Sequence, residues 1–389
     1  MPRNFTLYSN LYAKDMIDRI LLFPYYLTLK LRDRRYSNPK RKLFVPEVPC
    51  ISVGNVTVGG TGKTPHVEMI LRLLKSSDHW GDKHLAVLSR GYKRESRGFQ
   101  QVMAAGSAAM YGDEPLQIKN KFPDVTVAVD KNRVEGCSLL CHPEKLQEKK
   151  YAKKCWDKDF PPADYIILDD AFQYRKLKPA RSVVLVDYNR PVHKDMLLPL
   201  GRLRDLSERV GDADVVIVSK CPQDIDADQK CSFALEMGFK DYDPQLCEGI
   251  GVKGKRQTLL FTCLAYETPK MVFEGADNRY VYAKKLILVT GIAKDTALRN
   301  HLSDKYKIVA RFNFPDHHKY NWSDINKIKE ALRKNPLAAI ATTEKDMQRL
   351  LDYKGMPKDI KERLFMVPIK THFVSEVERS AFMDVVENL

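Results

Sequence analysis

Residues 53–65 read Val-Gly-Asn-Val-Thr-Val-Gly-Gly-Thr-Gly-Lys-Thr-Pro and decide the fold of the chain. An apolar run that ends at residues 51–53 precedes this stretch and predicts a buried strand. The apolar residues that follow it recur at helical spacing: Val67, Ile70, Leu71 and Leu74. Glycines between a strand and a helix are typical of a loop that binds nucleotide phosphates.

The loop residues have the chemistry that such a site needs. Glycines permit positive φ and let backbone N–H groups approach a phosphate. In this motif the lysine reaches the β- and γ-phosphates, and the next hydroxyl binds Mg²⁺, so Lys63 and Thr64 take these roles. The pattern departs from the common motif at Thr57, which stands where the first glycine is usual, and a merely glycine-rich turn is the alternative. The residues expected to bind ATP are Gly59, Gly60, Thr61, Gly62, Lys63 and Thr64.

A second stretch supplies the acidic strand end that a phosphate loop requires. Residues 165–170 read Tyr-Ile-Ile-Leu-Asp-Asp, which predicts a buried strand with Asp169 and Asp170 at its tip. Carboxylates at this place hold Mg²⁺ directly or through water. Thr64, Asp169 and Asp170 are therefore the candidate metal ligands, with a capped turn as the alternative for the two aspartates.

The length, composition and net charge of the chain limit the kinds of domain and binding partner that it can have. The chain has 389 residues, 44% of them hydrophobic, which is enough for two packed α/β domains. The net charge of +15 suits an anionic partner such as a phosphorylated substrate, an acidic membrane surface or nucleic acid. Basic residues are not interleaved with aromatic ones along a groove and no recognition motif is present, so nucleic acid is not expected.

The N-terminal segment favours contact with a membrane surface. Residues 17–31 are rich in apolar and aromatic side chains, but the uninterrupted part is too short for a bilayer and contains Pro24. A basic cluster follows at residues 30–42, opposed only by Asp33. This combination is typical of segments that lie on an anionic membrane. The alternative is a helix packed on the domain with a solvated basic tail.

Further candidate residues follow predicted strands. Arg90 and Tyr92 come directly after the strand at 85–88, at the edge where open α/β sheets bind ligands. Asp113 either caps a helix or belongs to a site, and its local sequence favours the cap. Arg204 either faces phosphates or binds Asp205 or solvent. His317 lies beside a carboxylate and is either a proton acceptor or part of a polar loop.

The predicted fold is α/β, with two α/β/α domains joined by a β-hairpin. The first is a P-loop NTPase domain with a mostly parallel sheet. We expect an N-terminal helical and basic segment at 1–43, the P-loop domain at 44–255, the hairpin linker at 256–283 and a smaller α/β domain at 284–389.

Together these motifs resemble the lipid A tetraacyldisaccharide 4′-kinase family of Gram-negative bacteria. The matching runs cover most of the chain in the family's order: 51–65, 88–93, 112–115, 167–173, 198–204, 314–317 and 342–346. The resemblance implies transfer of the ATP γ-phosphoryl group to the 4′-hydroxyl of a lipid A disaccharide 1-phosphate, with Mg²⁺. It also implies an active site between two domains and a peripheral or monotopic enzyme on the cytoplasmic face of the inner membrane, with no protein partner inferred.

The resemblance also assigns residues. It makes Asp113 and His317 the proton-handling pair, which replaces the local preference for Asp113 as a cap. Arg90, Tyr92 and Arg204 are expected to line the substrate or nucleotide side of the cleft. The chain departs from the family at residues 171, 174 and 205, where alanine, tyrosine and aspartate stand in place of the usual glycine, histidine and glutamate. Two rival functions stay open, a P-loop kinase or ATPase with a soluble phosphorylated substrate and a non-enzymatic nucleotide switch.

Overall fold

The computed structural model describes residues 20–152, 155–292 and 295–389, which form two compact units. Unit 1 comprises the chain up to Arg90, Asp130–Leu264 and Thr371–Leu389. Unit 2 comprises Gly91–Val129 and Ala265–Lys370. Residues 91–129 thus belong to the unit that contains the second half of the chain, although the sequence predicted them within the P-loop domain. The predicted domain boundaries remain a prediction.

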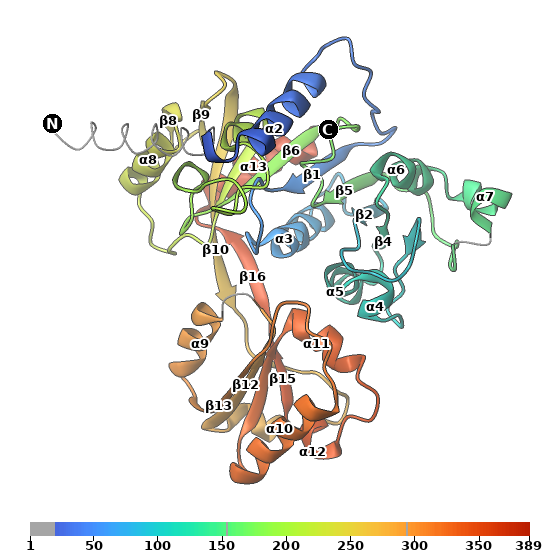
Figure 1. Ribbon diagram of the computed structural model, residues 1–389, viewed down its shortest axis with the longest axis vertical. Coiled ribbons are helices and arrows are strands. Elements are labelled where there is room, and N and C mark those ends of the chain that lie inside the picture. Colours follow the sequence, from blue (N-terminus) through green and yellow to red (C-terminus); the bar gives the residue numbers. More distant parts are fainter. Residues whose placement is uncertain (1–19, 153–154, 293–294) are drawn as a thin grey trace. The chain divides into compact units, whose positions relative to one another are not determined.

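A largely parallel sheet forms the centre of unit 1 (Figure 1). Its strands, in spatial order, are β2 (Leu85–Ser89), β5 (Tyr165–Asp169), β1 (Cys50–Gly54), β6 (Arg181–Asp187), β7 (Val215–Ser219), β10 (Arg256–Tyr266), β9 (Glu248–Ile250) and β8 (Lys240–Asp243). The pairs from β2 to β10 are parallel, whereas β9 and β8 are added antiparallel. Every residue of β1, β2, β5 and β7 is buried, because both faces of this sheet are covered.

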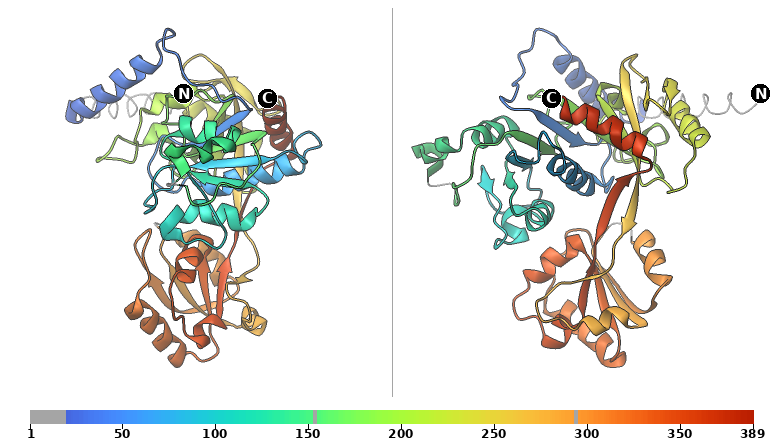
Figure 2. Two further views of the ribbon diagram at one scale, coloured as in Figure 1. Left: turned by 90° about the vertical axis from the view of Figure 1, so that its right-hand side faces the viewer. Right: turned by 180° about the vertical axis from the view of Figure 1, so that it is seen from behind.

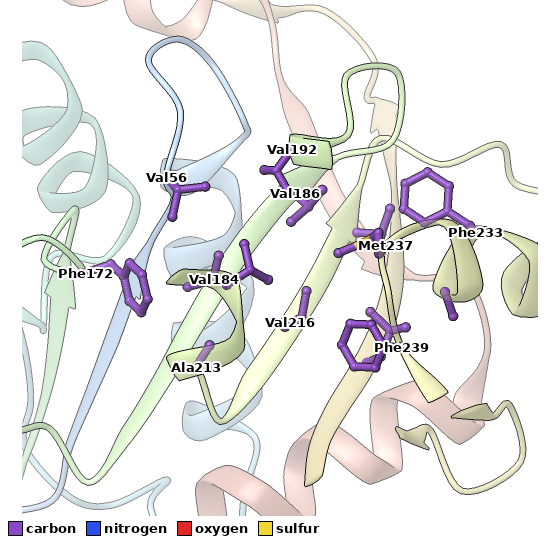
Figure 3. Close-up of a cluster of buried hydrophobic side chains, with 14 of the residues drawn as sticks. Val56, Phe172, Val184, Val186, Val192, Ala213, Val216, Phe233, Met237 and Phe239 are labelled. Atoms are coloured by element: carbon purple, nitrogen blue, oxygen red, sulfur yellow. The ribbon is translucent and has the colours of Figure 1, made fainter. Parts of the chain in front are cut away.

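Helices and short turns connect the strands of unit 1. They are α2 (Phe23–Tyr36), α3 (Lys63–Lys75), α6 (Arg133–Cys141), α7 (Lys149–Ala152), α8 (Ala227–Glu236) and α13 (Glu376–Glu387), with 3₁₀ turns at Pro143–Gln147, Val192–Lys194 and Ser207–Asp212. Capping boxes start α8 at Asp226 and α13 at Ser375. One face of the sheet packs a cluster of valines and aromatic rings, including Val184, Val216 and Phe239 (Figure 3).

Unit 2 contains a five-stranded sheet with helices on both faces (Figures 1 and 2). The strand order is β11 (Lys270–Met271), β15 (Leu364–Val367), β14 (Ala339–Thr343), β12 (Lys285–Thr290) and β13 (Lys307–Asn313). Alternate residues of β12 face opposite sides, as the period of a strand requires. Leu286 and Leu288 pack with α9 (Thr296–Ser303), whereas Ile287 and Val289 pack with α10 (Trp322–Lys334).

The remaining elements of unit 2 are α11 (Glu344–Leu351), α12 (Lys358–Lys361), a 3₁₀ turn at Asn278–Tyr282, and the segment that runs from 91 to 129. That segment contains β3 (Gln100–Gln101), α4 (Ala108–Tyr111), α5 (Asp113–Lys121) and β4 (Thr126–Val129), with β3 and β4 paired antiparallel. Asn120 binds Gln348 at 3.0 Å and Lys121 binds Glu344 at 2.6 Å. These contacts hold α5 beside α11, so residues distant in sequence meet in one unit.

The strands expected to form a hairpin at 256–283 have other partners. β10 pairs with β16 (Ile369–Phe373), near the end of the chain, and β11 pairs antiparallel with β15 in the other sheet. A short loop between two apolar runs predicted a local hairpin, but β10 pairs with β7, with β9 and with β16, which lies about a hundred residues later in the chain. The chain therefore leaves unit 1 along β10 and returns to it along β16.

Candidate functional sites in the two units

The phosphate loop lies between the end of β1 and the first turn of α3, as predicted (Figure 1). Gly59 has φ 103° and Gly62 has φ 87°, conformations that favour glycine. Thr57 forms an antiparallel bridge with Leu203, and this extended conformation suits any residue. The missing first glycine is therefore explained, because the loop needs no positive φ at that position.

One acidic and one basic side chain, those of Asp170 and Arg204, meet beside Lys63. Its Nζ lies 3.7 Å from Asp170 Oδ1 and 3.5 Å from Asn55 Oδ1. Arg204 donates to both carboxylate oxygens of Asp170 and, over 2.6 Å, to Asn55 Oδ1. Burial would raise the pKa of Asp170, but Lys63 and Arg204 outweigh it and lower that pKa. Asp170 is thus held as a carboxylate between two cations at the mouth of the loop.

Asp169 lies one residue earlier, at the carboxyl end of β5, and its side chain is only 1% exposed. Its Oδ2 accepts a hydrogen bond from Ser89 Oγ at 3.0 Å, and its carbonyl oxygen accepts one from Arg133 at 3.2 Å. Ser89 ends β2 and Arg133 begins α6, so neighbouring strand ends fix this carboxylate. Among the described residues no group of three or more histidines, cysteines or carboxylates is arranged to hold a metal ion by itself.

The end of β7 holds the loop from the other side. Ser219 Oγ donates to the carbonyl oxygen of Thr61 at 2.9 Å, and Lys220 Nζ donates to that of Gly60 at 2.5 Å. Lys220 also pairs with Asp187, at the end of β6, over 2.5 Å. With two consecutive carbonyl oxygens occupied by these donors, the loop backbone is fixed before any ligand binds.

His66 supports the same loop from within α3. It is fully buried, with Nδ1 2.7 Å from the carbonyl oxygen of Gly62 and Nε2 2.9 Å from Thr262 Oγ1. A carbonyl can only accept, so Nδ1 carries the proton and Nε2 accepts from the hydroxyl. Burial, helped by the charge of Lys220 and opposed by the hydrogen bond to Gly62, lowers the pKa of His66 to about 4.

The buried His66 predicts an acid-sensitive unit 1. Between pH 6.5 and 4.5 an unfolded chain binds a proton at this histidine that the folded chain does not bind. The contribution of the neutral His66 to the free energy of unfolding is therefore complete above pH 6.5 and is lost as the pH falls towards 4. Urea unfolding should show a free energy of unfolding that falls by about 2 to 3 kcal/mol more in the wild type than in His66→Gln over this range. Replacement of the exposed His79 by Gln is the control, and equal losses in wild type and His66→Gln would contradict the assignment.

In unit 2, the start of α5 places a buried carboxylate. Gly112 occupies the N-cap position with φ 97°, and Asp113 is the first residue of the helix. The side chain of Asp113 makes no cap hydrogen bond and is 8% exposed. The interpretation of Asp113 as a helix cap, which its local sequence favoured, is therefore wrong, because the preceding glycine takes that place.

His317 contacts this carboxylate. Its Nδ1 lies 2.8 Å from Asp113 Oδ2, and its backbone has φ 63° in the loop before α10. The adjacent His318 points elsewhere: its ring stacks on Phe314 at 4.5 Å and its Nε2 contacts Asp324 at 2.8 Å. The two histidines thus separate into one beside Asp113 and one that supports the start of α10.

The electrostatics around Asp113 favour its charged form strongly. Burial alone would raise the pKa of Asp113, but hydrogen bonds from His317 and Arg349 lower it to about 2. The ring of Tyr92 lies 5.3 Å from that of His317, so this predicted residue also belongs to the cluster in unit 2. Arg90, in contrast, is an exposed residue of unit 1 at the end of β2.

Sequence reasoning missed three residues of these clusters. Asn55 has no motif of its own, although it contacts Thr61, Lys63 and Arg204. Lys220 belongs to none of the motifs, although it contacts Gly60 and Asp187. Arg349 lies three residues after the last motif recognised in the sequence, and its helical spacing of four from Lys345 is the pattern that would have indicated it.

The parallel sheet, the phosphate loop and the acidic end of β5 define a P-loop kinase fold. The chain belongs to the tetraacyldisaccharide-1-P 4′-kinase family, whose model matches residues 17–387. It is 38% identical to the tetraacyldisaccharide 4′-kinase of Phocaeicola vulgatus over 336 residues, which cover 85% of this chain and 83% of that one. It is 35% identical to the enzyme of the same name from Parabacteroides distasonis over 383 residues, or 96% and 91% of the two chains.

A solved structure has the same fold. The crystal structure of the "apo" form of LpxK from Aquifex aeolicus in complex with ATP superposes with a TM-score of 0.64 at 24% identity, covering 94% of this chain and 96% of that one. The family predicted from the motifs is thereby confirmed, as are the α/β fold and the class of enzyme, an ATP-dependent kinase of lipid A biosynthesis.

Proposed function

We propose that this chain transfers the γ-phosphoryl group of ATP to the 4′-hydroxyl of a tetraacyldisaccharide 1-phosphate. The observation that carries the proposal is the histidine of unit 2 that is fixed on an ionised carboxylate, in a chain whose unit 1 bears a phosphate loop. A sugar hydroxyl is a weak nucleophile that must lose its proton, and a positioned histidine is suited to take it. A nucleotide switch that modifies no acceptor would not need this pair.

The residues of unit 1 bind ATP in this proposal. Backbone N–H groups of residues 59–62 and the start of α3 surround the phosphates, and Lys63 contacts the transferred group. Thr64 and Asp169 fit Mg²⁺, which prefers a few hydroxyl and carboxylate oxygens together with phosphates and water. Bound there, the ion would neutralise charge on the β- and γ-phosphates. Asp170 is already engaged by Lys63 and Arg204, so it acts by holding these two cations in place.

The residues of unit 2 handle the acceptor. Asp113 orients His317, which receives the proton of the hydroxyl as the new P–O bond forms. Tyr92, exposed beside His317, contacts the sugar. Arg90, which belongs to unit 1, contributes positive charge towards phosphate. The mixed donor and acceptor character of these groups matches a phosphorylated disaccharide.

The test is transfer of labelled phosphate from γ-labelled ATP to a lipid A disaccharide 1-phosphate. Labelled lipid product that requires Mg²⁺ is the expected result. Hydrolysis of ATP without labelled lipid would overturn the proposal. It would favour the alternative hypothesis that the chain is a P-loop kinase or ATPase with a soluble phosphorylated substrate. A parallel reaction with unacylated glucosamine phosphates distinguishes that alternative directly.

We further propose that α2 lies on the cytoplasmic face of the inner membrane. Large apolar side chains at a spacing of about four residues are exposed on it and just before it: Ile20, Leu21, Phe23, Leu27 and Leu31. Arg34 and Arg35 are exposed at its last turn. None of the helices within the described ranges is long and apolar enough to cross a bilayer. The first part of the predicted segment, residues 1–19, lies outside the described residues.

Ion pairs and the buried side chain of Leu29 hold α2 on unit 1, while Phe23, Leu27 and Leu31 remain exposed. Arg32 binds the buried Asp205 at 2.8 Å, Lys30 binds Glu208 at 2.5 Å, and Asp33 pairs with Arg175. Asp205, which replaces the usual glutamate of the family, therefore has a partner on this helix. Leu29, Arg32 and Asp33 lie on one side of the helix, opposite the exposed Phe23, Leu27 and Leu31, as surface attachment requires.

Replacing Phe23, Leu27 and Leu31 by Ser should weaken binding to vesicles that contain anionic lipid. Full burial of one large apolar side chain contributes about 1.5 to 3 kcal/mol. The loss of three partly inserted ones should therefore lower the binding constant for vesicles at least about tenfold. Co-sedimentation with vesicles measures this, and transfer to a short-chain acceptor should stay within about twofold. The matched control replaces Leu235, Leu246 and Val252, three exposed residues elsewhere in unit 1, and an equal loss there would contradict a role specific to α2.

A further inference from the structure

Arg349 binds the carboxylate of Asp113 with the two-pronged geometry of a guanidinium. It lies on α11 with its side chain 6% exposed. Its Nε donates to Asp113 Oδ1 at 3.0 Å, and its Nη2 donates to Asp113 Oδ2. Its Nη1 lies 3.4 Å from Asp346 Oδ1, which braces the guanidinium from its own helix. Both oxygens of Asp113 are therefore engaged by one buried cation, which favours the ionised form and fixes the plane of the carboxylate.

This arrangement determines which nitrogen of His317 carries the proton. Nδ1 of His317 and Nη2 of Arg349 lie 3.1 Å apart, and both approach Asp113 Oδ2. A guanidinium only donates and an ionised carboxylate only accepts. Nδ1 could accept from Arg349 or donate to Asp113, and the contact with the anionic oxygen is the shorter of the two, at 2.8 Å against 3.1 Å. A charge-assisted bond to a carboxylate is the stronger one, so we assign the proton to Nδ1, which donates to Asp113. The neutral imidazole then has its lone pair on Nε2.

The groups that face Nε2 are also charged. Lys345 Nζ lies 3.5 Å and Asp316 Oδ2 lies 3.6 Å from it. Lys345 in turn lies 3.5 Å from Glu114 and 3.1 Å from Asp316, so this cation is balanced by two carboxylates. Tyr92 packs its ring near His317 on a further side.

We propose that Arg349 is a positioning residue for phosphoryl transfer, whose guanidinium fixes the plane and the charge of Asp113, the carboxylate that orients His317 in the proposed function. This inference rests on the proposed function. In the step, the 4′-oxygen forms a bond to the γ-phosphorus while its proton passes to Nε2. The bond from the γ-phosphorus to the bridging oxygen breaks, ADP leaves with that electron pair, and the imidazolium later returns its proton to water.

The experiment compares Arg349→Ala and Arg349→Lys with the wild type. Because a misplaced base loses most of its contribution, kcat for lipid phosphorylation should fall about 100-fold in Arg349→Ala, while KM for ATP stays within about twofold. Added guanidinium should raise the kcat of Arg349→Ala at least about tenfold. Arg349→Lys should recover less activity, because an ammonium group cannot bind both carboxylate oxygens in the planar geometry of a guanidinium. Replacement of the exposed Arg333 on α10 by Ala is the matched control, with no change expected.

Nitrogen NMR of the wild type with labelled histidine gives a readout that does not depend on catalysis. The signal that disappears in His317→Gln should show a protonated Nδ1 and a bare Nε2 near neutral pH. A bare Nδ1 in that signal would overturn the proposal, and so would an Arg349→Ala enzyme that keeps the wild-type kcat. If instead the wild type labels no lipid while its NMR signal is as expected, the proposed function fails and the positioning of His317 by Arg349 stands.

Discussion

Lys63→Ala is expected to lower the rate of phosphate transfer to the lipid about 1,000-fold, the upper range for losing one preorganised charge at a reacting centre. The ammonium group of Lys63 lies at the first turn of α3, beside the loop that surrounds the phosphates. Charge that develops on the transferring group loses its nearest protein cation in the variant. The measurement is transfer from γ-labelled ATP under saturating acceptor, with Lys75→Ala, at the other end of the same helix, as control.

The structure separates this loss of activity from a loss of folding. Removing Lys63 leaves Asp170 with the two hydrogen bonds from Arg204, so no carboxylate becomes unpaired. Thermal unfolding of Lys63→Ala should therefore lie close to that of the wild type. A variant that retains more than about a tenth of the activity would show that Lys63 does not contact the transferred phosphoryl group.

The sequence predicted the elements of unit 1 well because local patterns determine them. The phosphate loop follows from glycines between an apolar strand and a helical repeat, and the tip of β5 follows from four apolar residues before Asp169. In unit 2, the apolar residues 286–289 likewise form most of β12, Lys285–Thr290. Each of these signals lies within about fifteen residues, the range over which periodicity is informative.

Contacts between distant segments could not be predicted in this way. Arg349 and Asp113 are 236 positions apart, and nothing in the sequence around either residue indicates the other. The partner of β10 is likewise the late strand β16, where a local hairpin was expected. The assignment of Asp113 illustrates the limit, because a carboxylate at a helix start usually caps the helix, and only the preceding glycine and the distant arginine exclude that role here.

Asp113→Asn should lower kcat by about 1,000-fold, within the range that general base catalysis contributes, and leave ATP binding almost unchanged. Asparagine keeps the shape of the side chain but presents a neutral amide to His317 and Arg349. The imidazole then loses the anionic acceptor that holds its proton on Nδ1, and a fraction of the histidine turns its protonated nitrogen to the substrate. Steady-state kinetics with lipid acceptor measures the effect, with Asp304→Asn on the surface of unit 2 as control.

The pH dependence distinguishes the two roles that Asp113 can have. Its folded pKa of about 2 lies below its ordinary value, so the stability gained from its charge is present above pH 3.8 and lost as the pH falls towards 2. If His317 is the proton acceptor, the acidic limb of kcat in the wild type falls at a pH far above 2, since Asp113 is already ionised there. An acidic limb that follows the pH dependence of stability down to pH 2 to 4 would instead make Asp113 the group that takes the proton. Because Asn cannot ionise, Asp113→Asn should lose activity equally at every pH above 5, and recovery of its activity at high pH would contradict the orienting role of the carboxylate.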